Sequence, residues 1–399
     1  MTADHPAPPA SLEGVSRGAG PGSASIRIFT SMDEAEAMWR AAERSLIHTA
    51  FQTYEWLATW VETLGTEVAI TPLIVLVEEG ERPVMLIPLG RAKRRGIATI
   101  TFLGGEVTDY HAPLVAADWQ DRLAPAGFAP LWTRILAALP RADLLRLGQM
   151  PEDILGVPNP FASLPGARPS DVALSLRLPA NVEDFRRGLR SNLASDTRRK
   201  RRRLAEIGAV EHAVARTPEE MSAAVAAMAD RKSRRFLETT GKDPFARPAF
   251  RAFYDRMSQR VPGDGAVQAS VLRVGGEVVA AHWGVIHRGR FYYLMIGWSA
   301  GEWFRYSVGR ILIDALIAAA IEDRLEVFDL TIGDEAYKSD WANERLTLLA
   351  LNLALSPAGR VVLAAEAARH ALRERAKRVQ WLRALVRRLA GRKPLTDGG

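Results

Sequence analysis

Hydrophobic positions over residues 25–149 follow two different spacings. Apolar residues that recur every three or four positions, such as Trp56, Trp60 and Leu64, predict helices, and short apolar runs bounded by Glu and Gly predict buried strands. In chain order the patterns predict a strand over 25–30, helices over 33–45 and 51–65, strands over 71–80, 81–90 and 98–105, a helix over 131–140 and a strand over 142–149. Short turns join the three successive strands, so we expect an antiparallel meander.

The same order of elements returns over residues 182–356. The patterns predict helices over 182–208 and 217–237, a second meander over 266–276, 277–289 and 290–299, a buried helix over 307–324 and strands over 325–333 and 345–356. Two related modules follow, which we place at 25–175 and 176–356. The predicted fold class is α+β, with a mixed, mainly antiparallel sheet flanked by helices in each module.

Both ends of the chain differ from this body. Residues 1–24 are rich in Pro, Gly, Ala and Ser, which predicts disorder. Residues 361–393 carry ten basic and two acidic residues, so this tail exceeds the whole net charge of +7 and leaves the body close to neutral. Over 357–399 we expect a basic amphipathic helix whose apolar stripe starts near Leu372. Docking of that stripe on the body and attachment to an anionic membrane surface through 372–393 both fit the pattern.

Composition narrows the chemistry. The sequence has no cysteine, and its seven histidines show no metal-ligand spacing, so we expect no metal cofactor. It has no apolar run long enough to span a membrane and no secretory signal pattern, so we expect a cytoplasmic location. The basic run over 186–206 lacks interleaved aromatic residues for base stacking, which favours a solvated amphipathic helix over a nucleic-acid site.

The most specific segment is DLTIGDEAYKSDWA, residues 329–342, which follows an apolar strand. Its pattern Asp-Leu-x-x-Gly-Asp-Glu-x-Tyr-Lys-x-x-Trp, together with the second meander and the helix SVGRILIDALI, resembles the CelD-like acyltransferases, a branch of the GNAT superfamily related to the Fem-type transferases. This resemblance implies tandem GNAT-like modules, with acetyl-CoA or another acyl-CoA as the donor for one of them.

The resemblance also implies the role of one residue. Tyr337 occupies the place of the tyrosine that serves as general acid in many GNAT modules. Acyl transfer also needs a base. Lys338 is then expected to hold an anionic group or to lower the pKa of Tyr337, while Asp329 and His282 are candidate bases. Structural readings are open for both: Asp329 as an acceptor for loop N–H groups, and His282 as an ordinary core histidine.

Donor binding is expected at the start of the helix over 307–324, because helix N-termini attract phosphate. Ser307 is a candidate cap, Gly309 permits close approach of the backbone, and Arg305 and Arg310 add charge. The loop is poorer in glycine than most GNAT loops, and an ordinary helix start is the alternative. We expect Asp109, after the first meander, and Trp341 at the acceptor, with the first module shaping that pocket.

Three functions fit these residues. The first is an acyltransferase that moves an acyl group from CoA to an amine or hydroxyl of a sugar, polysaccharide or envelope precursor. The second is a Fem-like transferase that uses aminoacyl-tRNA as donor. The third is a non-catalytic binding protein that retains the fold.

Overall fold

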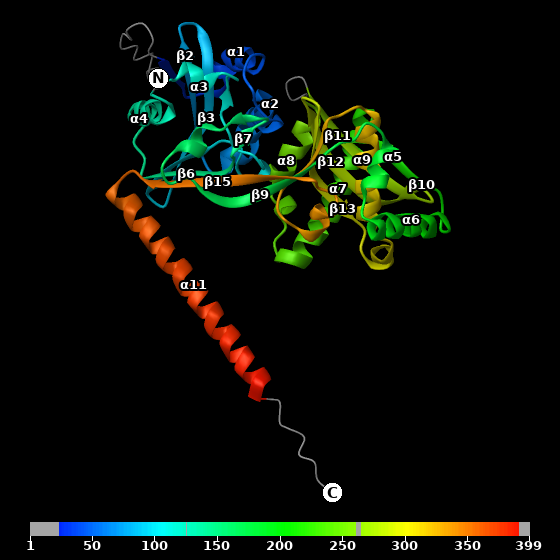
Figure 1. Ribbon diagram of the computed structural model, residues 1–399. Helices are drawn as coiled ribbons and strands as arrows, with labels where there is room; N and C mark the ends of the chain where they lie inside the picture. The colour runs from blue at the N-terminus through cyan, green and yellow to red at the C-terminus, as the bar shows by residue number, and fades with distance from the viewer. Residues whose placement is uncertain (1–23, 125, 261–264, 391–399) are drawn as a thin grey trace, which may run out of the picture.

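The computed structural model describes residues 24–124, 126–260 and 265–390 (Figure 1). Within them, thirteen strands form one sheet that runs through both halves of the chain, in the order β1-β2-β3-β4-β6-β15-β9-β14-β13-β12-β11-β10, with β5 beside β3. Most neighbouring strands are antiparallel; β4 with β6 and β13 with β14 are parallel. The predicted α+β class with a mainly antiparallel sheet and flanking helices is confirmed.

The first half begins with the predicted strand and helices and continues into the meander. Its strands are β1 (Ser25–Phe29), β2 (Thr71–Glu79), β3 (Arg82–Arg94), β4 (Ile97–Phe102), β5 (Leu114–Val115), β6 (Leu144–Pro151) and β9 (Arg168–Arg177). Its α-helices are α1 (Met32–Glu43), α2 (Tyr54–Trp60), α3 (Trp119–Arg122) and α4 (Phe128–Ala138). A small hairpin, β7 (Asp153–Ile154) with β8 (Val157–Pro158), lies outside the main sheet.

The second half repeats this order after two added helices. Its strands are β10 (Val210–Val214), β11 (Ala266–Val274), β12 (Glu277–His287), β13 (Arg290–Trp298), β14 (Val327–Ile332) and β15 (Glu344–Ala354). Its helices are α5 (Val182–Gly188), α6 (Ser191–Ala205), α7 (Pro218–Thr240), α8 (Pro248–Met257), α9 (Val308–Glu322), α10 (Ala336–Ser339) and α11 (Pro357–Ala390). Each half therefore reads strand, two helices, three-strand meander, helix, strand and strand.

The last strand of each repeat crosses into the other half. β15, from the second repeat, pairs with β6 of the first, and β9, from the first repeat, pairs with β14 of the second. β15 and β9 pair with each other at the centre of the sheet. Figure 1 shows both strands running between the two halves. The exchange fixes the halves to each other through backbone hydrogen bonds.

Two hydrophobic cores cover the two faces of the sheet in the second half. The larger core joins the first half to α7 and α8, and the smaller lies under α5, α6 and α9. Close packing of α7 depends on Gly297 in β13, because a Cβ there would lie 2.6 Å from the carbonyl oxygen of Met228. α9 is buried along most of its length, as its apolar sequence predicts.

The parallel pair of β13 and β14 separates soon after it forms. Only residues 290–292 pair with 327–329, although both strands continue. β13 has a bulge against β12 at Leu294, and β14 shifts register at Leu330, where Thr331 adopts a positive φ of 59°. The strands therefore open a gap in the sheet at their carboxyl ends.

Some boundaries differ from the sequence predictions. The single helix predicted over 182–208 is two helices, because Leu189 and Arg190 adopt extended backbone angles. The patterns missed β9, β10 and α8. The residues predicted to be disordered lie outside the described ones up to position 23. The tail does form the helix α11, but the side chains of its predicted apolar stripe from position 376 onward lie outside the description.

Candidate active site

A cavity of about 680 Å³ opens where β13 and β14 separate. Its walls come from α6, α7, β13, α9, α10 and the 3₁₀ turn η6 (Gly301–Tyr306), which links β13 to α9. The apolar part of the wall is largely aromatic: Tyr293, Trp298, Trp303, Phe304, Tyr337 and Trp341. Such a cavity can hold an elongated ligand with an apolar section and a charged end.

All four residues predicted to bind the donor line this cavity, at the start of α9. Ser307 holds the N-cap position with a positive φ of 51°, but its side chain does not cap the helix. Its hydroxyl instead accepts a hydrogen bond from Lys200 Nζ at 2.6 Å. The predicted capping role is therefore wrong.

Gly309 lies against the ring of Trp298, since an added Cβ would come within 3.3 Å of that ring. This glycine thus allows an aromatic wall to reach the helix start. Arg310 donates to Asp196 of α6 at 2.7 Å, and the Arg305 side chain donates to the backbone oxygen of Glu302. The Arg310 N–H already donates to the Ser307 oxygen at 2.9 Å, so the first-turn N–H groups of α9 left without an intrahelical acceptor are those of Val308 and Gly309.

Cations outnumber carboxylates on the wall. The cations are Lys200, Lys232, Arg235, Arg305 and Arg310, and the carboxylates are Glu335 and Asp340. Asp340 forms an ion pair with Arg190, outside the wall. The excess positive charge and the end of α9 together suit a phosphate-bearing ligand.

Sequence reasoning missed three of these cations, Lys200, Lys232 and Arg235. Lys200 lies in the basic run of α6, and the other two lie on the helix α7. Lys232 has no ion pair among the described residues; its ammonium lies 5.1 Å from the centre of the Phe236 ring. Burial, and then the charge of Lys338, lower the pKa of Lys232. The available signal for Lys200 was the basic run over 186–206, which was interpreted as a solvated helix face; no pattern singled out Lys232 or Arg235.

Tyr337 lies on the cavity wall in α10, with 40% of its surface exposed. Burial and the neighbouring Glu335 carboxylate raise its pKa, so the phenol is protonated at neutral pH. The buried phenol of Tyr293 is next to it, and its pKa is also raised, first by burial. The cavity wall thus includes both a protonated phenol and the N-terminus of α9.

Lys338 does not share this position. Its side chain is buried, donates to the carbonyl oxygen of Ile332 and pairs with Glu335 at 3.1 Å. It is absent from the cavity wall. The expected contact of Lys338 with an anionic ligand group is therefore not supported; the ammonium holds the turn between β14 and α10.

His282 is fully buried in β12 and is also absent from the cavity wall. Its ring stacks on Phe291 and on Tyr293, with centroids 5.4 Å and 5.1 Å away. Burial, followed by the charge of His212, lowers its pKa to about 3. The prediction of a base that titrates near neutrality is wrong, because this site disfavours the charged ring.

Asp329 of β14 lies at the seam, by which we mean the contact between the second half and the first. Its carboxylate accepts hydrogen bonds from Tyr110 Oη at 2.7 Å, from the Thr331 N–H at 2.8 Å and from Arg290 at 2.9 Å. It borders a second cavity of about 570 Å³, which does not include Tyr337. The candidate base is thus a structural acceptor, which was the alternative reading.

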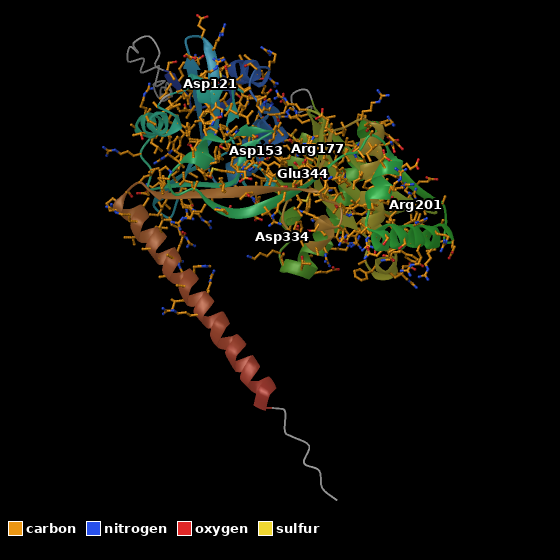
Figure 2. The ribbon with its side chains drawn as sticks, in the orientation of Figure 1. Asp121, Asp153, Arg177, Arg201, Asp334 and Glu344 are labelled. Atoms are coloured by element: carbon orange, nitrogen blue, oxygen red, sulfur yellow. The ribbon has the colours of Figure 1, made fainter. Side chains whose placement is uncertain are left out.

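This second cavity lies where the exchanged strands meet. Figure 2 labels Arg177 of β9, Glu344 of β15 and Asp153 beside it; Arg177 and Glu344 form an ion pair at 2.8 Å. Its buried charges are paired with each other, Arg290 with Asp329 among them. Because these charged side chains form ion pairs with each other, we interpret the second cavity as part of the contact that holds the two halves together.

The two residues predicted for the acceptor separate. Trp341 lines the large cavity and stacks on Phe185 with centroids 6.2 Å apart. Asp109 does not line it, but reaches the second half next to Thr331 and Lys338. Burial raises the pKa of Asp109 to about 6, against a hydrogen bond from Thr331 that lowers it. Among the described residues, no group of three His, Asp or Glu side chains could hold a metal ion.

Comparison with known proteins agrees with this geometry. Residues 191–339 match the family described as "Acetyltransferase (GNAT) domain", a span that contains α6, Tyr337 and all of the cavity wall except Asp340 and Trp341. No curated protein sequence matches the chain. The match shows a GNAT domain over this part of the second half and supports an acyl-transferring enzyme; the narrower CelD-like assignment stays a prediction.

Three solved structures share the fold over most of the chain. FemX aligns with a TM-score of 0.55 at 10% identity, covering 82% of this chain and 97% of its own. The C-terminal domain of a putative lysylphosphatidylglycerol synthetase from Agrobacterium fabrum gives 0.52 at 14% identity, covering 85% and 96%. A protein of unknown function from Bacteroides thetaiotaomicron gives 0.50 at 11% identity, covering 82% and 99%. At these identities the likeness concerns the fold alone.

Proposed function

We propose that the protein transfers an acyl group from acyl-CoA to an amine or hydroxyl acceptor. One observation carries this proposal: Tyr337 and the N-terminus of α9 face the same cation-lined cavity. The acceptor class we favour, a sugar, polysaccharide or envelope precursor, rests on the CelD-like resemblance. A cytoplasmic location, with attachment of the tail helix to the inner membrane face, belongs to the same proposal; no helix among the described residues is long and apolar enough to cross a membrane.

The cavity fits such a donor in its two chemical parts. Phosphates would lie at the first turn of α9, where backbone N–H groups, Lys200 and Arg305 supply positive charge. The apolar arm would follow the aromatic wall formed by Trp298 and Tyr293 toward the gap in the sheet. The thioester would then reach the point where β13 and β14 separate.

The residues at that point can serve the reaction. The acceptor lone pair attacks the carbonyl carbon, the C–S bond breaks, and Tyr337 Oη gives its proton to the departing thiolate. Its raised pKa keeps that proton in place until the thiolate forms. The bulge at Leu294 removes backbone groups of β13 from the ladder, and we assign these to the developing oxyanion.

Neither predicted base, Asp329 or His282, lines the cavity, so another residue is needed to remove the acceptor proton. Glu335 is the carboxylate on the wall beside Tyr337, with half of its side chain exposed. We assign to Glu335 the removal of the acceptor proton, directly or through water.

The basic helix α6 favours a second candidate, a Fem-like transferase with aminoacyl-tRNA as donor. Figure 2 labels Arg201 on α6, and Lys200 of the same helix reaches Ser307 at the cavity. A polyanionic donor could therefore contact α6 while its acyl end enters the cavity. A binding protein without catalysis is the third candidate.

Titration calorimetry of the full chain with CoA, and separately with uncharged tRNA, tests the proposal. We expect saturable binding of CoA at one site and salt-sensitive, weaker binding of tRNA. Binding of tRNA alone would favour the Fem-like candidate. Binding of CoA without acyl transfer to amino sugars or other amines would favour the binding protein.

A further inference from the structure

A second feature consists of exposed side chains on η6 and on the C-terminal part of α7, beside the cavity. Phe304 of η6 is 73% exposed, the highest fraction among large hydrophobic side chains of the described residues. It lines the cavity and also a shallow groove that continues along α7 past Arg231, Arg234 and Arg235. Leu237, one turn beyond Arg234 on α7, is 54% exposed. We call Phe304, Leu237, Arg234, Arg235 and Arg305 the basic rim.

The helix α6 extends the positive charge of the basic rim. It contacts η6 and is fastened there by the bond from Lys200 to Ser307. Its outward arginines include Arg198, Arg202 and Arg203, all exposed, and none of these three forms an ion pair within the part of the chain that the structure describes. Asp196 is shared among Arg199, Lys200 and Arg310, so it cannot neutralise the helix.

Phe304 borders the cavity but belongs to neither hydrophobic core. Its neighbour Trp303 is buried and joins the smaller core, so η6 is already anchored without it. A solvent-exposed aromatic ring beside arginines is the pattern of protein surfaces that enter the headgroup region of a bilayer. Each arginine near an anionic surface adds attraction that salt weakens.

We propose that the basic rim and α6 dock on a bilayer that contains anionic lipid, with Phe304 and Leu237 inserted between headgroups. RNA fits the charge but not the rest of the surface, because Leu237 is aliphatic and cannot stack on a base as single-strand binders require. The inference concerns a surface outside the tail helix α11. It does not depend on acyl transfer, since docking needs neither donor nor acceptor.

Co-sedimentation with vesicles tests it. The full-length protein is mixed with vesicles of phosphatidylcholine and with vesicles in which phosphatidylglycerol is the minor lipid. We expect binding to the second kind only, lost at high salt. The double variant Phe304→Ser, Leu237→Ser should bind roughly tenfold more weakly, and each of Arg198→Gln, Arg202→Gln and Arg203→Gln should cost roughly fivefold. Val68→Ser, which removes an equally exposed side chain from the first half, should change nothing.

The outcomes separate the candidates. Because all these side chains are exposed, thermal unfolding should show wild-type stability for each variant, and binding losses then report the surface. Unchanged vesicle binding by the Phe304 and arginine variants would overturn the proposal and assign any binding to α11. Binding of tRNA that depends on the same arginines, without vesicle binding, would also overturn it in favour of RNA.

Discussion

The two halves share one order of elements but differ in the connection that follows the third meander strand. In the second half, η6 joins β13 to α9 directly, and the cavity stays open beside it. In the first half, the chain between β4 and α4 is much longer and adds a 3₁₀ turn, β5 and α3. It buries Tyr110 and His111 there, and β5 pairs with β3. The longer connection fills what the shorter one leaves open.

The starts of the two equivalent helices, α9 and α4, show the same difference between an open and a filled position. α9 begins at the cavity, with Lys200 bound to its N-cap residue. α4 begins with Phe128, which is buried, stacks on Trp132 and packs edge to face against Phe161. The start of α9 therefore lines the large cavity, whereas Phe128 at the start of α4 packs into the core of the first half. One copy of the fold therefore has an open cavity, which we propose as the ligand site, while the longer connection in the other copy is packed into its core.

Tyr337→Phe has the largest expected effect and tests whether the chemistry lies in the second half. Without the phenol proton the leaving thiolate loses its acid, so we expect kcat to fall about 10²- to 10⁴-fold with little change in KM. Steady-state kinetics with an acyl-CoA and an accepted amine measure this. Tyr110→Phe is the matched control from the first half: it should lower stability and spare turnover. Equal kcat for wild type and Tyr337→Phe would remove Tyr337 from the mechanism.

Asp329→Asn tests whether the seam is structural. The change leaves Arg290 without its buried ionic partner and weakens the bond from Tyr110, so we expect a loss of about 3 kcal/mol in the free energy of unfolding. Urea unfolding at neutral pH gives the value. If Asp329 were the catalytic base, stability would hardly change while kcat collapsed, and the division between site and seam would fail.

Much of the fold could be read from the sequence because its strands and helices have strong periodic patterns. The meanders and the apolar helix over 307–324 follow directly from such patterns. Strand exchange could not be predicted in this way. β9 was not predicted as a strand, and the strand pattern of β15 does not tell which neighbour it will pair with. Pairing between distant strands is decided by tertiary packing, which a pattern along the chain does not record.

Site residues could be predicted where their spacing along the chain reflects the fold. They could not be predicted where the direction of the side chain determines whether it reaches the cavity. Tyr337 and the start of α9 both face the cavity as expected. Lys338, the next residue, points into the turn instead, since neighbours on a helix do not share a face. Lys232 lies far from the motif in sequence and reaches the cavity only because α7 packs on β13. His282 is likewise buried away from the cavity, and its burial could not be recognised from the spacing of residues along the chain.

A smaller test uses Asp109, the first-half residue that reaches β14. Burial raises its pKa from 3.8 to about 6, so the folded state favours the protonated form. The stability from protonated Asp109 is fully present below about pH 4 and is lost as pH rises through 6. Asp109→Asn should therefore match wild type near pH 4 and exceed it by about 2 kcal/mol at pH 8. Unfolding curves across this range measure the difference; a constant gap would show that Asp109 titrates normally.

The smallest expected effect separates the two helix starts directly. Lys200→Met removes the ammonium that binds Ser307 and faces the cavity, while a methionine keeps much of the side-chain length. Because one charge-assisted contact to phosphate is lost, CoA should bind roughly tenfold more weakly by calorimetry. Lys93→Met is the control, since Lys93 borders a separate cavity of the first half near the end of α4. Equal weakening by both variants would mean that CoA binding depends on the overall charge of the protein. The proposal of a donor site at the start of α9 would then be wrong.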